Sequence, residues 1–197
     1  MTDPRFEVPT WNKTYTMLMN QADKIRCSGF KPDVIVGVSR GGWVPARILS
    51  DLLENPNLAN VRVEFYSGKA GTKEAPVLTQ EVSMPVAGKR VLIVDDVADT
   101  GRSLRLVFEH VLQKGAGEVQ IATLYYKPWS AVKPDYYEEQ TERWIAFPWD
   151  VKETARKMLG KHGHASIEEI AAKLAEAGLP KKLATMLLKE TTVEKPC

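Results

Sequence analysis

Short apolar runs alternate along the chain with stretches whose apolar residues recur every three or four positions. The runs are rich in β-branched and aromatic residues and predict strands at residues 34–38, 61–66, 91–94 and 119–126. The stretches between them predict helices from Trp11, over 43–53 and over 104–112. Because strand and helix alternate, we expect an α/β fold: a parallel sheet of about five strands with helices on both faces.

The first helix is predicted from an apolar stripe that ends at Gly29. The stripe consists of Trp11, Tyr15, Leu18, Ala22 and Ile25. We assign its aromatic side chains to the core rather than to a ligand. Further along, residues 67–85 are polar, with a short edge strand expected around Val77, Leu78 and Val82. Such a stretch suits either a mobile lid or a simple surface loop.

The most informative stretch runs from Lys89 to Leu104, where a buried strand leads through a polar loop into a helix. The strand ends in two acids and the loop is small and polar: Asp95, Asp96, Asp99, Thr100, Gly101, Arg102 and Ser103. A helix N-terminus has unpaired N–H groups, so this loop suits a phosphate. Ligands of open α/β sheets bind beyond the carboxyl ends of the strands. An ordinary N-cap explains Asp99 or Thr100, but not three acids together with this loop.

A second strand-to-helix turn, Ser39-Arg40-Gly41-Gly42, follows the strand at 34–38. Two consecutive glycines let backbone N–H groups surround an anion, and Arg40 adds a fixed positive charge. Taken alone, a Gly-Gly turn is equally consistent with a plain tight turn. Beside the loop after Asp95, it indicates one ligand held by both turns.

Two later segments carry candidate groups for an aromatic base. Lys127 follows the strand at 119–126, and residues 144–150 read Trp-Ile-Ala-Phe-Pro-Trp-Asp. An ammonium can donate to a carbonyl oxygen, and a Trp face can stack on a base, worth about 1–3 kcal/mol. The structural alternatives are a solvated lysine and aromatic residues of the core.

Residues 91–104, Val-Leu-Ile-Val-Asp-Asp-Val-Ala-Asp-Thr-Gly-Arg-Ser-Leu, resemble the phosphoribosyl-pyrophosphate (PRPP) signature of type I phosphoribosyltransferases. Ser-Arg-Gly-Gly resembles the pyrophosphate loop of that family, and residues 144–150 resemble the hood of its xanthine–guanine members. The resemblance implies a cis peptide bond between Ser39 and Arg40 and a lid within residues 67–85. The Ser-Tyr order of the hypoxanthine–guanine lids is reversed here, at Tyr66-Ser67.

The same resemblance implies a role for each candidate residue. PRPP binding is assigned to Ser39, Arg40, Gly41, Gly42, Asp95, Asp96, Asp99, Thr100, Gly101, Arg102 and Ser103. Asp99 is the base for the purine N7 proton, Lys127 contacts the purine O6, Trp144 stacks on the base and Ile145 contacts it through its backbone. Mg²⁺ is expected at Asp95, Asp96 and Asp150. The implied reaction moves ribose 5-phosphate from PRPP to N9 of a 6-oxopurine (hypoxanthine, guanine or xanthine), with release of pyrophosphate, in a homodimer.

Composition adds few constraints. The 197 residues carry a net charge of +2, which demands neither nucleic acid nor a membrane surface. No apolar run reaches membrane-spanning length, and we see no signal peptide. Cys27 and Cys197 make no disulfide framework, so we expect a reduced, cytoplasmic protein. The charged runs at 69–74, 138–143 and 153–157 mix both signs and are interpreted as solvated faces.

We expect a phosphoribosyltransferase domain with its hood at 1–159 and a helical extension at 160–197. A linker over 160–164 precedes a capping box, Ser166 to Glu169, and a helix that ends at Gly178. A second helix follows Pro180 and is expected to face inward at Leu183, Met186 and Leu187.

Packing on the domain or on a subunit partner is the expected role of this helix pair. The alternative is a non-catalytic PRPP-sensing regulator that uses the pair to read DNA. A third possibility keeps the chemistry but takes adenine or orotate. Lys127 opposes adenine, because an ammonium cannot accept a hydrogen bond from the 6-amino group.

Overall fold

The computed structural model describes residues 6–66, 75–161 and 166–192. The chain forms two compact units: Thr14–Glu142, here called the sheet unit, and Met1–Lys13 with Arg143–Cys197, here called the terminal unit. Each unit has its own hydrophobic core. The predicted division after residue 159 stays a prediction.

The sheet unit contains six strands in the order β4-β3-β2-β5-β6-β7. Their bounds are β2 Val34–Ser39, β3 Leu58–Tyr66, β4 Ala75–Gln80, β5 Arg90–Ala98, β6 Glu118–Tyr126 and β7 Tyr136–Gln140. Five strands run parallel, and β4 pairs antiparallel with β3 at one edge. The predicted parallel sheet of about five strands is therefore confirmed. The predicted edge strand is confirmed at Val77 and Leu78 and wrong at Val82, which lies beyond the end of β4. Residues 67–74 lie outside the described residues.

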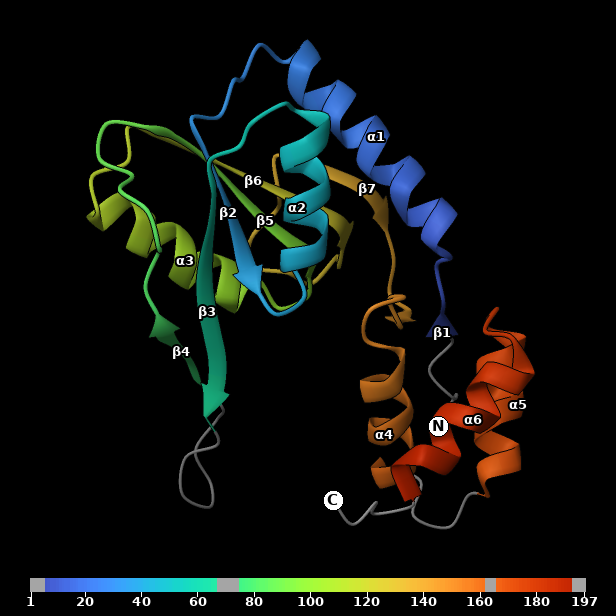
Figure 1. The fold of residues 1–197 in the computed structure, drawn as a ribbon. Coiled ribbons are helices and arrows are strands. Elements are labelled where there is room, and N and C mark those ends of the chain that lie inside the picture. Colours follow the sequence, from blue (N-terminus) through green and yellow to red (C-terminus); the bar gives the residue numbers. More distant parts are fainter. Residues whose placement is uncertain (1–5, 67–74, 162–165, 193–197) are drawn as a thin grey trace. The chain divides into compact units, whose positions relative to one another are not determined.

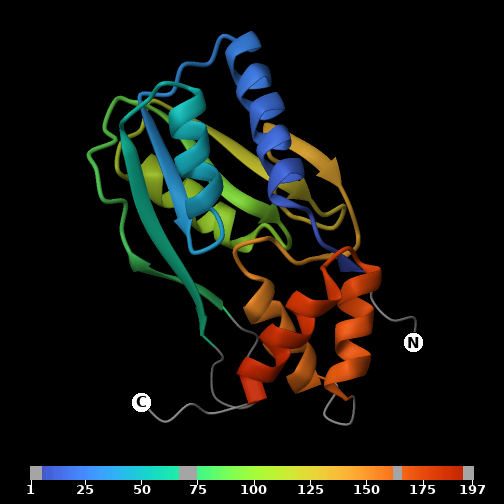
Figure 2. The same ribbon diagram turned by 45° about the vertical axis from the view of Figure 1, so that its right-hand side comes forward.

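Helices cover both faces of this sheet, as predicted (Figures 1 and 2). Val36 of β2 and Ile93 of β5 share a core with Val107 of α3 (Arg102–Gln113). Gly37 points the other way, because neighbouring strand residues alternate between faces. A Cβ on Gly37 would lie 2.9 Å from the Cβ of Ala46 in α2 (Trp43–Leu52). Residue 37 therefore lets α2 approach the sheet closely.

Helix α1 (Trp11–Cys27) forms as predicted, but its buried face differs from the predicted stripe. Its buried residues are Thr14, Met17, Leu18, Gln21, Ala22 and Ile25. The assignment of Trp11 and Tyr15 to the core is wrong, since both are about half exposed. A stripe spaced at three and four residues does not fix where the first turn meets the sheet. The Gln21 side chain instead donates to the Thr123 carbonyl at 2.8 Å.

One strand, β7, was not predicted from the sequence. We interpreted residues 138–143 as a solvated face, yet β7 continues the sheet beside β6. The interpretation is wrong for Glu138, whose side chain is 8% exposed and pairs with Lys24 of α1 at 2.9 Å. A polar edge strand carries no apolar run, so periodicity alone did not reveal it.

The terminal unit joins both ends of the chain. Strands β1 (Phe6–Glu7) and β8 (Trp144–Ile145) pair in parallel. Helices α4 (Val151–Lys161), α5 (Ile167–Glu176) and α6 (Lys181–Thr192) share one core, which includes Met158 and Leu174. The capping box at Ser166 and Glu169 is confirmed. Most of the predicted linker, residues 162–164, lies outside the described residues.

The expected inward face of α6 is partly wrong. Leu183 and Met186 are exposed, and Ala184 and Leu188 are buried instead. The helix is rotated by about one position relative to the predicted stripe. Its apolar side packs against α4 and α5, so the helix pair fills its own core within the terminal unit.

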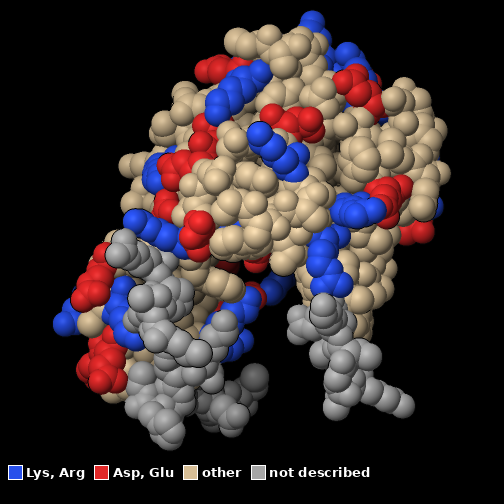
Figure 3. All heavy atoms as spheres, turned by 180° about the vertical axis from the view of Figure 1, so that it is seen from behind, with Lys and Arg blue, Asp and Glu red and all other residues tan. Residues whose placement is uncertain are grey.

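Surface charge is mixed on the face seen in Figure 3, where Lys and Arg lie among Asp and Glu. Neither sign dominates that face. Within the described ranges no helix combines the length and apolarity that crossing a membrane requires.

Candidate active site

The two turns predicted to bind a ligand, after β2 and after β5, lie together at the carboxyl ends of the parallel strands. Strands β2 and β5 are parallel neighbours, so the turns that follow them leave the same edge. A Cβ on Gly41 would overlap the carboxylate of Asp96, and one on Gly42 would lie 2.8 Å from the Cα of Asp95. Only glycine permits this approach at both positions. The Ser39–Arg40 peptide bond is cis, as the resemblance implied.

The two acids lie in direct contact with each other. The Asp96 N–H donates to Asp95 Oδ1 at 3.0 Å. Burial, followed by the charge of Asp96, raises the pKa of Asp95 well above its usual range, and the N–H groups of Asp96 and Gly42 offset this in part. Charge repulsion of this kind favours a cation or hydroxyl donors at the site.

Helix α3 begins at this edge with an open N-terminus. Gly101 precedes it in the left-handed region, at φ 77°, and no side chain caps the helix. The first N–H groups of an α-helix have no partner within the helix, so the anion-binding role predicted for residues 100–103 is compatible with this geometry and stays a prediction. The Thr100 hydroxyl is 3.5 Å from the Arg102 nitrogen, at the limit of a hydrogen bond.

The loop after β6 packs tightly on this anion loop. A Cβ on Gly101 would lie 2.6 Å from the Val132 nitrogen and 2.7 Å from Ser130 Oγ. Two backbone hydrogen bonds tie the loops together: the Lys127 N–H donates to the Ala98 carbonyl at 3.0 Å, and the Ala131 N–H to the Thr100 carbonyl at 3.1 Å. The two loops therefore form one structure.

Because the two loops are in contact, both Asp99 and Lys127 lie close to Trp129, a residue that was not predicted from the sequence. The Trp129 indole N–H donates to Asp99 Oδ1 at 3.0 Å. The same indole ring lies 5.6 Å from Lys127 Nζ, and Lys127 is only 5% exposed. Trp129 stands two positions after Lys127, and only this proximity in the chain could have indicated it.

The other predicted residues, Trp144, Ile145 and Asp150, belong to the terminal unit. Trp144 is partly exposed in β8, with Lys157 Nζ 5.8 Å from its ring centroid. Ile145 is buried. The Asp150 carbonyl accepts from the Thr154 N–H at 2.9 Å at the start of α4. Their roles toward base and metal stay predictions.

A divalent cation fits the acid pair. Mg²⁺ is usually bound through one or two carboxylates together with substrate phosphates. Over the described part of the chain, no group of three or more His, Cys, Asp and Glu side chains forms a ready cage. Asp95 and Asp96 offer two adjacent carboxylates beside both anion turns, which suits an ion that arrives with a pyrophosphate.

Comparison with known proteins agrees with this geometry. The profile of the phosphoribosyl transferase domain matches residues 12–156, and the chain belongs to that family. A xanthine-guanine phosphoribosyltransferase of Gluconobacter oxydans is 38% identical over 121 residues, which cover 59% of this chain and 67% of the relative. A hypoxanthine-guanine phosphoribosyltransferase of Saccharomyces cerevisiae is 29% identical over 126 residues, covering 55% of this chain and 56% of the relative.

Among solved structures, a purine phosphoribosyltransferase from Pyrococcus horikoshii matches with a TM-score of 0.68 and 46% identity. The match covers 74% of this chain and 93% of that one. The similarity extends over most of that structure, so the type I phosphoribosyltransferase fold expected from the sequence is confirmed.

Proposed function

We propose that the chain transfers ribose 5-phosphate from PRPP to N9 of a 6-oxopurine, namely hypoxanthine, guanine or xanthine. The observation that carries this proposal is the contact between the Gly41–Gly42 turn and the Asp95–Asp96 pair of β5, the strand that leads into the N-terminus of α3. Two anion-binding turns flanking two carboxylates suit a sugar with a phosphate at each end.

In this proposal each turn binds one end of PRPP. The 5-phosphate lies on Thr100 to Ser103, where the positive end of the α3 dipole stabilises it. The pyrophosphate lies on Ser39 to Gly42, with Arg40 nearby. Asp95 and Asp96 accept hydrogen bonds from the ribose hydroxyls or metal-bound water. Mg²⁺, when bound at these acids with Asp150, supplies positive charge that stabilises the departing pyrophosphate.

Transfer exchanges one bond for another at ribose C1. The purine N9 forms a bond to C1 while the bond from C1 to the pyrophosphate oxygen breaks. Positive charge that develops on the ribose ring is stabilised by the nearby carboxylates. Asp99 accepts the proton that leaves the purine at N7, and Trp129 holds the acceptor carboxylate in position.

Recognition of the base is assigned to Lys127, Trp144 and Ile145. A buried lysine with its ammonium near the Trp129 ring suits a purine carbonyl at position 6, and the names of the relatives point to the same class of base. Trp144 stacks on the ring, and the Ile145 backbone contacts its edge. We place the enzyme in the cytoplasm as a homodimer, following the family resemblance.

A substrate panel tests this function. The protein is incubated with PRPP, Mg²⁺ and one base at a time: hypoxanthine, guanine, xanthine, adenine or orotate. Nucleotide and pyrophosphate are then measured. We expect product with at least one 6-oxopurine and none with adenine or orotate. Product only with adenine or orotate contradicts the assignment of Lys127. No product with any base, together with specific DNA binding, favours the regulator instead.

A further inference from the structure

A cavity of about 600 Å³ opens at the amino ends of the strands, at the other end of the sheet from the candidate active site. Its lining residues come from the ends of α1 and α2 and from the segments just before β2, β3 and β5. The catalytic loops follow the other ends of β2 and β5, so a full strand length separates the two places. A volume of this size lies within the range of small-molecule sites.

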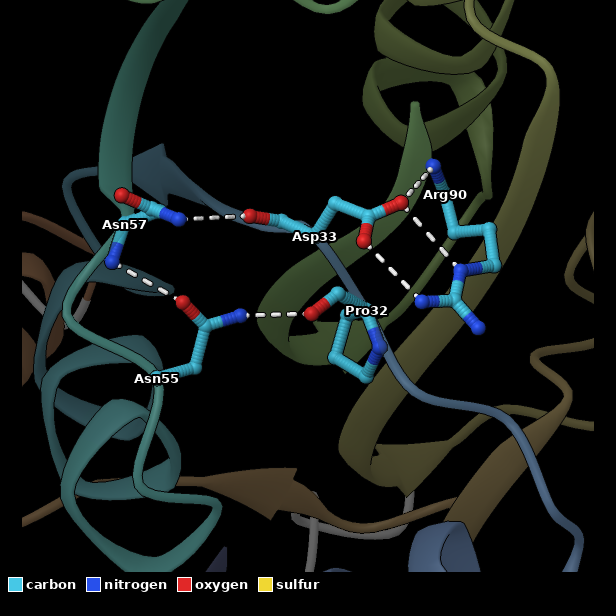
Figure 4. A network of polar contacts seen from close by, with 5 residues as sticks. All are labelled: Pro32, Asp33, Asn55, Asn57 and Arg90. Carbon is cyan, nitrogen blue, oxygen red and sulfur yellow. Dashed lines mark hydrogen bonds and ion pairs between the residues drawn. The ribbon is translucent and has the colours of Figure 1, made fainter. Parts of the chain in front are cut away.

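One wall of the cavity consists of Pro32, Asp33, Asn55 and Asn57, and hydrogen bonds join these residues to one another and to Arg90 (Figure 4). Asp33 binds the Arg90 side chain at 3.0 and 3.2 Å and the Arg90 N–H at 2.8 Å. The Asn55 amide donates to the Pro32 carbonyl at 2.7 Å, and the Asn57 amide to the Asp33 carbonyl at 3.0 Å. The wall is thus formed before any ligand binds.

The same contacts leave a surplus of positive charge at the cavity. Arg90 lowers the pKa of Asp33 to about 2, so the charge of Asp33 is already matched by Arg90. Arg26 pairs with Asp23 and donates to the Leu52 carbonyl at 2.9 Å. Lys31 and Lys89 line the cavity, and neither forms an ion pair with any acid that the structure describes. Two ammonium groups therefore remain for an anion.

Two side-chain acceptors at the cavity accept no hydrogen bond from any protein group that the structure describes. One is the carboxylate of Glu54. The other is the side-chain oxygen of Asn57, whose amide nitrogen is bound to Asp33. Both residues line the cavity, and so do the apolar side chains of Phe30 and Pro56. Donors, acceptors and an apolar surface are therefore present together.

Glu54 occupies a backbone position that favours another residue. It follows the C-cap of α2 and has φ 52°, in the left-handed region where helices commonly end in glycine. Its negative charge also lies at the negative end of the helix dipole. Both features reduce local stability, and such conflicts with local preference are concentrated at functional sites.

We propose that this cavity is a second ligand site, which binds a phosphorylated ribose or a nucleotide. The phosphate lies between Lys31 and Lys89, because ammonium groups are strong partners for it. Sugar hydroxyls donate to Glu54 and to the side-chain oxygen of Asn57. The apolar surface of Phe30 and Pro56 covers the carbon skeleton or base. The inference is independent of the proposed catalysis, because the two sites use different residues.

A backbone amide NMR titration tests it, using ribose 5-phosphate and AMP as probes and ribose and inorganic phosphate as separate arms. We expect both probes to shift the amides of Leu53, Asn57 and Lys89. Signals of Gly41 and Gly101 report the catalytic edge independently. The double variant K31Q/K89Q is expected to bind at least tenfold more weakly at the cavity. The control K182Q, an exposed lysine of α6, is expected to bind like the unaltered protein.

Unshifted cavity amides at millimolar probe, or equal binding by K31Q/K89Q, overturn the proposal. A second variant, Glu54→Gly, separates binding from folding. Glycine suits this backbone, so its unfolding midpoint is expected to rise by about 2–4 °C, while ribose 5-phosphate binding weakens several-fold. A stabilised variant with unchanged binding means that Glu54 only ends the helix, and the role assigned to it is then wrong.

Discussion

The acidic residues at the two ends of the parallel strands have their pKa values shifted in opposite directions. Strands β2 and β5 contribute to both ends of the sheet. At the amino ends, Asp33 accepts three hydrogen bonds from Arg90, and its pKa is lowered to about 2. At the carboxyl ends, Asp95 lies beside Asp96, and burial raises its pKa. The acid at the amino ends is neutralised within the protein, whereas the acid pair at the carboxyl ends is left to be neutralised by a ligand. The comparison contrasts an acid that stabilises the fold with acids that we assign to PRPP binding.

The largest effect is expected for Asp99→Asn at the carboxyl edge. The substitution removes the proposed proton acceptor but keeps the shape of the side chain, so kcat is expected to fall by roughly 10²–10⁴-fold. Asp99 is exposed, and the unfolding midpoint is expected to stay within about 1 °C. Steady-state kinetics with the active 6-oxopurine measure this. Asp51→Asn, another exposed acid, serves as control, and comparable kcat for both variants contradicts the role.

Trp129→Phe tests whether the indole N–H positions Asp99 at the carboxyl ends of the strands. It keeps an aromatic ring near Lys127 and removes only the indole N–H that Asp99 accepts. Loss of one hydrogen bond to a charged group predicts about a tenfold decrease in kcat. Steady-state kinetics measure kcat, and melting curves report whether the fold is disturbed. A kcat equal to that of the unaltered protein contradicts the positioning role of Trp129, and a fall in the unfolding midpoint that accompanies the loss of kcat indicates a structural role only.

Asp95→Asn is expected to have opposite effects on folding and binding. A carboxyl group whose pKa is raised in the folded state binds more protons there than in the unfolded chain, so its ionisation opposes folding as the pH rises above about 4. The neutral variant is therefore expected to unfold roughly 2–4 °C higher at pH 8 without ligand. PRPP binding, followed by calorimetry, is expected to weaken at least tenfold. A lower midpoint refutes the view that Asp95 is held at a cost in stability.

The smallest effect is expected for Asp33→Asn at the amino edge. Because the pKa of Asp33 is lower in the folded state, its ionised form stabilises the protein above pH 4, and this contribution is lost as the pH falls from about 4 to about 2. The variant is expected to melt slightly lower at pH 7 and equally at pH 2, with kcat unchanged. Melting curves across this pH range are the measurement. An equal deficit at both pH values excludes the ion pair as the cause.

The sequence was sufficient for the parts of the molecule that are local in the chain. A glycine pair or an acid pair at a strand end can be recognised within a few residues, and the two strand-to-helix turns assigned to PRPP were predicted in this way. That both turns leave the same end of the sheet was expected because ligands of open α/β sheets bind beyond the carboxyl ends of the strands. The direct pairing of β2 with β5 comes from the structure.

The rest depends on contacts between distant residues. The hydrogen bond between Trp129 and Asp99 spans 30 positions, and the pair of Asp33 with Arg90 spans 57. No periodicity reports such contacts. Strand β7 was missed because an edge strand needs only one neighbour and tolerates charge, as Glu138 shows. The exposed Tyr15 was misassigned because helical spacing defines a stripe but not the depth of each member.

The tight fit of Gly101 against Ser130 and Val132 has a consequence for how this enzyme can be altered. A side chain at position 101 would have to displace the backbone of the neighbouring loop, which carries Lys127 and Trp129. Mutational libraries that vary residues 99–103 alone will therefore yield mostly inactive variants. Co-randomising residues 127–132 gives compensating pairs a chance to arise, so a change of base preference is best sought in both loops at once.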